Sequence, residues 1–144
     1  MSSEKLLTLK TSDGEEFVLE EAMAFRSLTI KNAASTNTNN NTPLSINVQS
    51  NTMIKVIEYW TKHSERDISE DQLMTFDKNF FKLMDKSKLF DLVLATNYLA
   101  ATELLDAACE QVADRIRRKT PEEIRDFFNI TREDEEQIFK ELNN

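Results

Sequence analysis

The sequence predicts an α+β protein in which a few short strands near the amino terminus precede a cluster of helices. Two observations lead to this class. Short apolar segments bounded by polar and turn residues occupy much of the first 48 positions, which is typical of half-buried strands. Beyond residue 50, apolar residues instead recur every three or four positions, which is the period of amphipathic helices.

The predicted strands are short. The first two, Leu6–Leu9 and Glu16–Leu19, flank an Asp13-Gly14 turn and should therefore form a hairpin. Gly14 is the only glycine in the chain, and it lies where the backbone needs a positive φ. A third strand is predicted over Leu44–Val48, because its alternate residues are apolar.

Helices are predicted between the strands and through the second half of the chain. The polar segment Ser35–Thr42 and the acidic segment Ser64–Asp71 are predicted to be solvated loops. Asn51 is expected to cap a helix that ends at His63, with Val56 and its neighbours Ile54, Ile57 and Trp60 facing inward. The other predicted helices are Ala22–Ala34, Asp77–Met84, Lys88–Leu99, Thr102–Arg118, Pro121–Phe128 and Arg132–Leu142.

The segment Lys119–Ile130 contains the strongest local signal. Thr120 is a typical N-cap residue, and Pro121 occupies the first helical position, where its missing N–H has no effect. Glu123, three residues after the cap, completes a capping box. These residues predict that a helix begins at Pro121.

This helix has an apolar ridge, formed by Ile124, Phe127 and Phe128 on one face. Few residues follow it, so we expect the domain core to leave part of the ridge uncovered. An uncovered apolar ridge near a terminus indicates a binding surface for another chain. The alternative is that the ridge belongs to the core.

Composition and charge argue against several functional classes. A net charge of -8 and a pI near 4.8 disfavour nucleic acid and anionic membranes as partners. A single cysteine excludes an internal disulfide, and no apolar run approaches the ~20 residues that cross a bilayer. Without a signal peptide, we expect a soluble intracellular protein.

Residues that could support catalysis are few. His63, the only histidine, is expected at a solvated helix end or as a partner of the helix C-terminal dipole. Cys109 lies on an apolar stripe and is expected to be an inert packed thiol. One glycine is too few for a phosphate-binding loop, and the acidic clusters lack the spacing of a calcium loop. We therefore expect no catalytic residue, metal, cofactor or small-molecule substrate.

Ten short segments match a known family in order and spacing. They are Leu9–Glu15, Leu19–Ala22, Thr29–Lys31, Pro43-Leu44, Lys55–Tyr59, Leu89–Leu92, Asn97–Leu99, Leu104–Asp106, Lys119–Arg125 and Phe128–Ile130. On these segments the chain resembles the S-phase-kinase-associated protein (Skp) family, the adaptor subunits of SCF (Skp–cullin–F-box) ubiquitin ligases, and most closely its plant branch.

The resemblance implies a BTB/POZ-type fold over residues 1–105 and added helices over residues 106–144 that bind F-box receptors. It implies a non-enzymatic adaptor of the nucleus and cytoplasm, linking the cullin N-terminal region to F-box proteins for protein degradation. Asn97 and Tyr98, at the end of one helix before the turn to the next, match the cullin-contact motif. The residues that match or extend the F-box surface are Cys109, Val112, Ile116, Pro121, Ile124, Phe127, Phe128 and Ile130.

The chain departs from the family pattern in several places. Arg117-Arg118 stands where a Lys-Gly pair is usual, and Phe76-Asp77 stands where Trp-Asp is common. The usual insertion after Ile130 and a terminal tryptophan segment are missing, so we expect a divergent adaptor with weaker or more selective receptor binding. Two alternatives remain open. One is an elongin C-like adaptor, which the Thr120–Leu142 extension disfavours, and the other is a pseudo-adaptor that binds receptors or another partner without a cullin.

Overall fold

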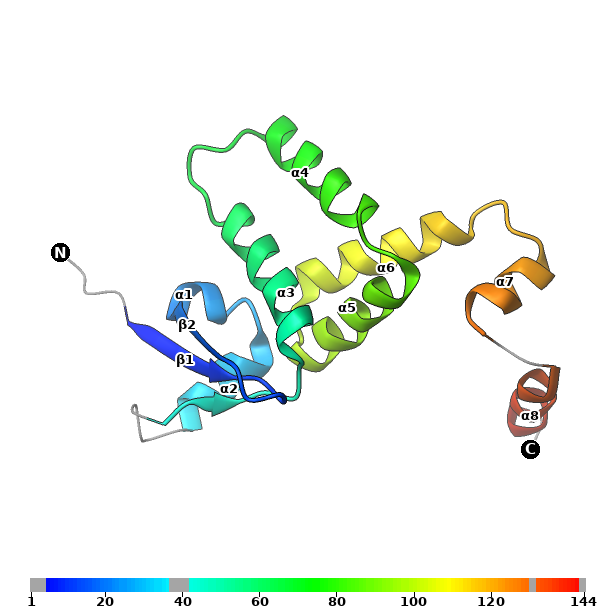
Figure 1. The fold of residues 1–144 in the computed structure, drawn as a ribbon, viewed down its shortest axis with the longest axis horizontal. Helices are drawn as coiled ribbons and strands as arrows, with labels where there is room; N and C mark the ends of the chain where they lie inside the picture. The colour runs from blue at the N-terminus through cyan, green and yellow to red at the C-terminus, as the bar shows by residue number, and fades with distance from the viewer. Residues whose placement is uncertain (1–4, 37–41, 130–131, 143–144) are drawn as a thin grey trace. The chain divides into compact units, whose positions relative to one another are not determined.

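A computed structural model describes residues 5–36, 42–129 and 132–142 (Figure 1). Within these residues a small three-stranded sheet precedes a succession of helices, so the predicted α+β class is confirmed. In chain order the elements are β1 (Leu6–Lys10), β2 (Glu16–Glu20), α1 (Glu21–Ala24), α2 (Leu28–Thr36), β3 (Leu44–Ser45), α3 (Ser50–His63), α4 (Glu70–Lys82), α5 (Lys86–Leu99), α6 (Thr102–Ile116), α7 (Pro121–Phe127) and α8 (Arg132–Leu142).

The chain divides into two compact units, Met1–Glu110 and Gln111–Asn144, and the boundary falls within α6. In the first unit, α1 packs against β1 and β2, while α3 packs against both α4 and α5. The core of this unit is formed by apolar side chains from its strands and helices. Its fully buried side chains include Leu9, Ile30, Met53, Val56, Trp60, Phe81, Leu89, Leu92, Leu99 and Leu104.

The sheet has the order β2-β1-β3. β1 and β2 form the predicted antiparallel hairpin, and Gly14 in its turn has a φ of 90°. β3 pairs in parallel with β1 but covers only Leu44–Ser45, so the prediction of a strand through Val48 was too long. β1 ends at Lys10, where the chain enters the hairpin turn, so β3 has no strand to pair with beyond Ser45. Ile46 and Val48 are nevertheless buried, as their alternation predicted.

Two predicted helix boundaries were wrong for local reasons. The single helix expected over Ala22–Ala34 is two helices, because the buried Ser27 interrupts it. The Ser27 hydroxyl accepts a hydrogen bond from the Ile30 N–H at 3.0 Å and donates one to the Leu99 carbonyl at 2.5 Å. α4 begins seven residues before the predicted Asp77, at a capping box formed by Ser69 and Gln72.

α3 also differs from the prediction. It begins at Ser50, so Asn51 lies inside its first turn and is not its cap. Ile54, predicted to face inward, is 51% exposed, and Ile57 is half-buried. The predicted inward positions of Val56 and Trp60 are confirmed. The buried face of α3 consists of Met53, Val56, Tyr59 and Trp60.

The cap of α3 comes from the β1–β2 hairpin. Asp13 accepts hydrogen bonds from the Ser50 N–H at 2.9 Å and from the Ser50 hydroxyl at 2.5 Å. A third hydrogen bond comes from the Thr11 hydroxyl at 2.7 Å. The side-chain hydrogen bonds from Ser50 and Thr11 lower the pKa of Asp13 from 3.8 to about 2.

We expect Asp13→Asn to lower the free energy of unfolding at pH 7. Because the folded-state pKa lies below the unfolded one, the carboxylate stabilises the fold above about pH 4 and loses this effect as pH falls toward 2. Denaturant unfolding between pH 7 and pH 2 should therefore show a wild-type advantage that shrinks below pH 4. Asp91→Asn, an exposed carboxylate of α5, is the control. An advantage that is constant across this range would contradict the assignment.

Candidate partner-binding surfaces

α7 begins as the sequence predicts. The Glu123 N–H donates to the Thr120 hydroxyl at 3.2 Å, and the Thr120 N–H donates to the Glu123 carboxylate at 3.3 Å. Pro121 occupies the first turn. This reciprocal cap fixes where α7 starts and therefore which residues share its apolar face.

The apolar ridge of α7 is only partly covered. No residue of α7 is buried: Ile124 and Phe127 are half-buried, and Phe128, which ends the helix, is 37% exposed. The Phe127 and Phe128 rings meet edge to face, with centroids 5.2 Å apart. The Lys119 Nζ lies 5.4 Å from the Phe127 ring centroid, within cation–π distance. The ridge is thus preorganised by its own contacts while much of its area faces solvent.

The second half of α6 contributes three more of the predicted F-box residues. Val112 and Ile116 are half-buried. Cys109 is exposed, so the prediction of a packed thiol was wrong. The buried side of α6 is formed by Leu104 and Ala108, and Cys109 lies one position beyond that stripe. Pro121 is exposed, and Ile130 lies outside the described residues.

Asn97 and Tyr98 lie in the last turn of α5, at the end of the helix, as predicted. Ala100, with a φ of 50°, ends the helix directly after them. Both side chains are exposed, Tyr98 by 41%. The Tyr98 hydroxyl accepts a hydrogen bond from the Asn47 N–H at 3.2 Å, which fixes the ring against the surface.

Tyr98 borders a groove of about 350 Å³ between α5 and the start of α3. A second groove of about 260 Å³ shares Thr52 and Asp91 with it, so the two follow one another along α3 and α5. Ile54 and Leu94, which line these grooves, are 51% and 69% exposed. This face therefore combines an aromatic residue, a shallow depression and uncovered aliphatic side chains, a combination typical of protein interfaces.

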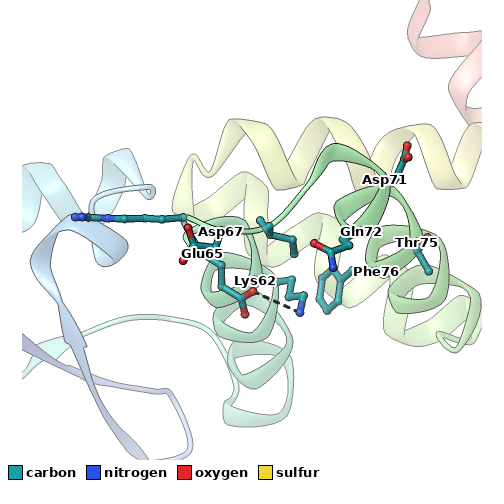
Figure 2. Close-up of a pocket in the computed structure, with 9 residues that line it drawn as sticks. Lys62, Glu65, Asp67, Asp71, Gln72, Thr75 and Phe76 are labelled. Atoms are coloured by element: carbon teal, nitrogen blue, oxygen red, sulfur yellow. Dashed lines mark ion pairs between the residues drawn. The ribbon is translucent and has the colours of Figure 1, made fainter.

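A third cleft, of about 780 Å³, lies between the loop after α3 and α4 (Figure 2). Lys62 and Glu65 form an ion pair on one side of it at 3.6 Å, and Asp71 lies away from this pair in Figure 2. Its lining residues include no histidine or cysteine that could act as a base or thiol nucleophile. Within the described residues, no group of three or more His, Cys, Asp or Glu is placed to hold a metal ion.

His63 ends α3 as predicted, but its side chain is largely buried and not solvated as expected. Its side chain is 11% exposed, with Nε2 2.7 Å from Asp77 of α4 and Nδ1 3.3 Å from Glu103 of α6. Its ring stacks on Tyr59 at 4.0 Å. Arg26 completes this His63 cluster by pairing with Glu103 at 3.1 Å and donating to the His63 carbonyl. Burial, followed by the Asp77 and Glu103 charges, raises the pKa of Tyr59 above its usual value.

The geometry of the His63 cluster indicates a structural role. We expect His63→Ala to lower the free energy of unfolding by about 2 kcal/mol, because it removes a largely buried ring that stacks on Tyr59 and leaves the half-buried Asp77 carboxylate without this partner. His63→Phe should recover the part that comes from stacking on Tyr59. Lys62→Ala, on the preceding residue, is the control for loss of a side chain from this turn, and urea unfolding is the measurement. A loss below about 0.5 kcal/mol for His63→Ala would contradict the structural role.

None of the described helices has the length and apolarity to span a bilayer.

Comparison with known proteins identifies the family. Residues 5–65 match the Skp1 family tetramerisation domain, and residues 102–143 match the Skp1 family dimerisation domain. SKP1-like protein 11 of Arabidopsis thaliana is 44% identical over 147 residues, covering 96% of this chain and 95% of the relative. SKP1-like protein 1A of the same plant is 43% identical, with 96% of each chain covered. SKP1-like protein 1 of Oryza sativa subsp. japonica is 43% identical, covering 95% of this chain and 92% of the relative.

These matches confirm the resemblance stated from the sequence and the BTB/POZ-type fold it implies. They support an adaptor role in SCF ubiquitin ligases in general, and family members of this kind are adaptors and not enzymes. With relatives above 40% identity along nearly its whole length, the chain belongs to the Skp1 family.

Proposed function

We propose that this chain is a non-catalytic adaptor that links the N-terminal region of a cullin to F-box substrate receptors, for ubiquitin-dependent degradation in the nucleus and cytoplasm. One observation carries the proposal. This Skp1 family chain has two distinct surfaces, and each has an exposed aromatic residue. One surface centres on Tyr98 in the first unit, and the other on Phe128 in the second. An adaptor needs two such surfaces, because it must hold two partners at once.

The surface around Tyr98 is suited to the cullin. A tyrosine supplies rigid apolar area together with a polar tip, and such residues are frequent anchors of interfaces. Here the ring is already held by the Asn47 N–H, so little side-chain freedom is lost on binding. Asn97 beside it adds an exposed amide that can both donate and accept hydrogen bonds.

The surface on α6 and α7 is suited to the F-box. The apolar ridge and the half-buried Val112 and Ile116 offer side chains that gain burial only when another chain covers them. Fully burying one such side chain contributes ~1.5–3 kcal/mol. Several of them suffice for a stable complex with an amphipathic partner helix.

Affinity purification of the tagged chain from plant cells tests the proposal. We expect a cullin and a set of F-box proteins to copurify, and both to be absent from a control with the tag alone. Recovery of F-box proteins without a cullin would instead support the pseudo-adaptor. Recovery of neither class would contradict the adaptor function.

A further inference from the structure

Arg118 occupies an unfavourable backbone conformation in the turn between α6 and α7. Its φ is 70°, in the left-handed region that glycine adopts without strain and that a side chain disfavours. The turn is closed by a hydrogen bond from the Lys119 N–H to the Ile116 carbonyl at 3.1 Å. An arginine is thus held where the backbone itself favours glycine, and its side chain is exposed.

The charges around this turn differ from those of the whole chain. Residues 115–128 contain five Arg and Lys side chains against three Asp and Glu, although the net charge of the chain is -8. The neighbours of Arg118 are engaged within the chain: Arg117 pairs with Asp114, and Lys119 lies over Phe127. Within the described residues, Arg118 pairs with no acidic side chain. Its guanidinium is available to a group on a partner.

Arg118 also lies next to the apolar ridge. Lys119, the following residue, contacts the Phe127 ring, so the turn lies beside the Phe127 end of the ridge. A partner that covers Ile124 and Phe128 must pass close to this positively charged turn. Guanidinium groups bind carboxylates with paired hydrogen bonds, which gives such a contact directional preference as well as attraction.

From this arrangement we infer that Arg118 is a specificity residue, selecting F-box receptors that place a carboxylate side chain beside the apolar residues covering the ridge. The inference rests on the proposed function and names the class of receptor that the surface prefers. The expected contribution is modest, roughly three- to fivefold in affinity, because the contact lies at a solvent-exposed rim.

The test is a double-mutant cycle with the full chain and one recombinant F-box protein rich in acidic residues. Single Asp→Asn and Glu→Gln variants across its F-box are titrated against the wild-type chain and against Arg118→Gln at low salt. We expect one acidic position at which the amide weakens wild-type binding three- to fivefold and leaves Arg118→Gln binding unchanged. This difference should vanish at 0.5 M salt, where exposed charges are screened.

Two further variants separate charge from backbone strain. Arg118→Gly removes the charge and relieves the strain, so its Tm should rise by roughly 2–4 °C, whereas Arg118→Gln should leave Tm near the wild-type value. With both variants, changing the coupled acidic position of the F-box to its amide should no longer weaken binding. The control is Arg66→Gln, which removes the same charge from an exposed position in the loop before α4. With this variant the amide should still weaken binding three- to fivefold.

The two possible failures are distinguishable. The specificity role is overturned, while receptor binding stands, if no amide substitution in the F-box distinguishes the wild-type chain from Arg118→Gln. It is also overturned if Arg66→Gln removes the effect of the amide to the same extent. If the wild-type chain does not bind the F-box protein, the proposed function itself is overturned.

Discussion

Replacing Asn97 and Tyr98 together with lysine is expected to weaken binding to the cullin N-terminal region by at least about a hundredfold. Both side chains are exposed at the end of α5, and Tyr98 supplies that face with a large aromatic ring. Two lysines remove this area and place two flexible, strongly hydrated charges in the contact. Isothermal titration with a recombinant cullin N-terminal region measures the loss.

The control introduces two lysines elsewhere on the first unit. Leu6 and Val18 are exposed and lie on the outer face of the sheet, so Leu6→Lys with Val18→Lys should leave cullin binding unchanged. F-box binding should remain intact in both double variants. If the Asn97 and Tyr98 variant binds the cullin as the wild type does, the contact has been placed wrongly.

Changing both Ile124 and Phe128 to glutamine is expected to weaken F-box binding at least tenfold. The loss arises because two apolar side chains that a receptor would cover become polar, and each such burial contributes ~1.5–3 kcal/mol. α7 has no buried residue, so the fold should tolerate both changes. Binding is measured by titration with a recombinant F-box protein, and circular dichroism reports the helix content.

Glu122→Gln is the matched control on the same helix. Glu122 is exposed and does not belong to the capping box, which uses Glu123. It should bind receptors as the wild type does. If the double variant instead loses helix content along with binding, the ridge is part of the core and the receptor surface has been misassigned.

Local signals predicted much of the fold, and distant partners explain most of what the sequence could not show. The start of α7 was predictable because Thr120, Pro121 and Glu123 lie within four residues. The capping box of Ser69 and Gln72 was equally local, so the start of α4 was also predictable from its spacing.

α3 and the His63 cluster show why distant contacts limit such predictions. The apolar side of α3 is broader than the face that the fold buries, so periodicity placed Ile54 inward although it is exposed, and the helix is capped by Asp13, 37 residues earlier. His63 seemed suited to solvent because its partners, Asp77 and Glu103, are brought to it only by tertiary packing. The ridge was easier to identify, because its exposure follows from a short helix with few neighbours.

In the proposed function, one copy of this chain holds a cullin and an F-box protein at the same time. The most direct measurement is size-exclusion chromatography with light scattering on an equimolar mixture of the chain, a cullin N-terminal region and an F-box protein. We expect a single complex with the mass of one copy of each, which forms only when the chain is present. Two separate binary complexes, with the cullin and the F-box protein competing for the chain, would contradict it.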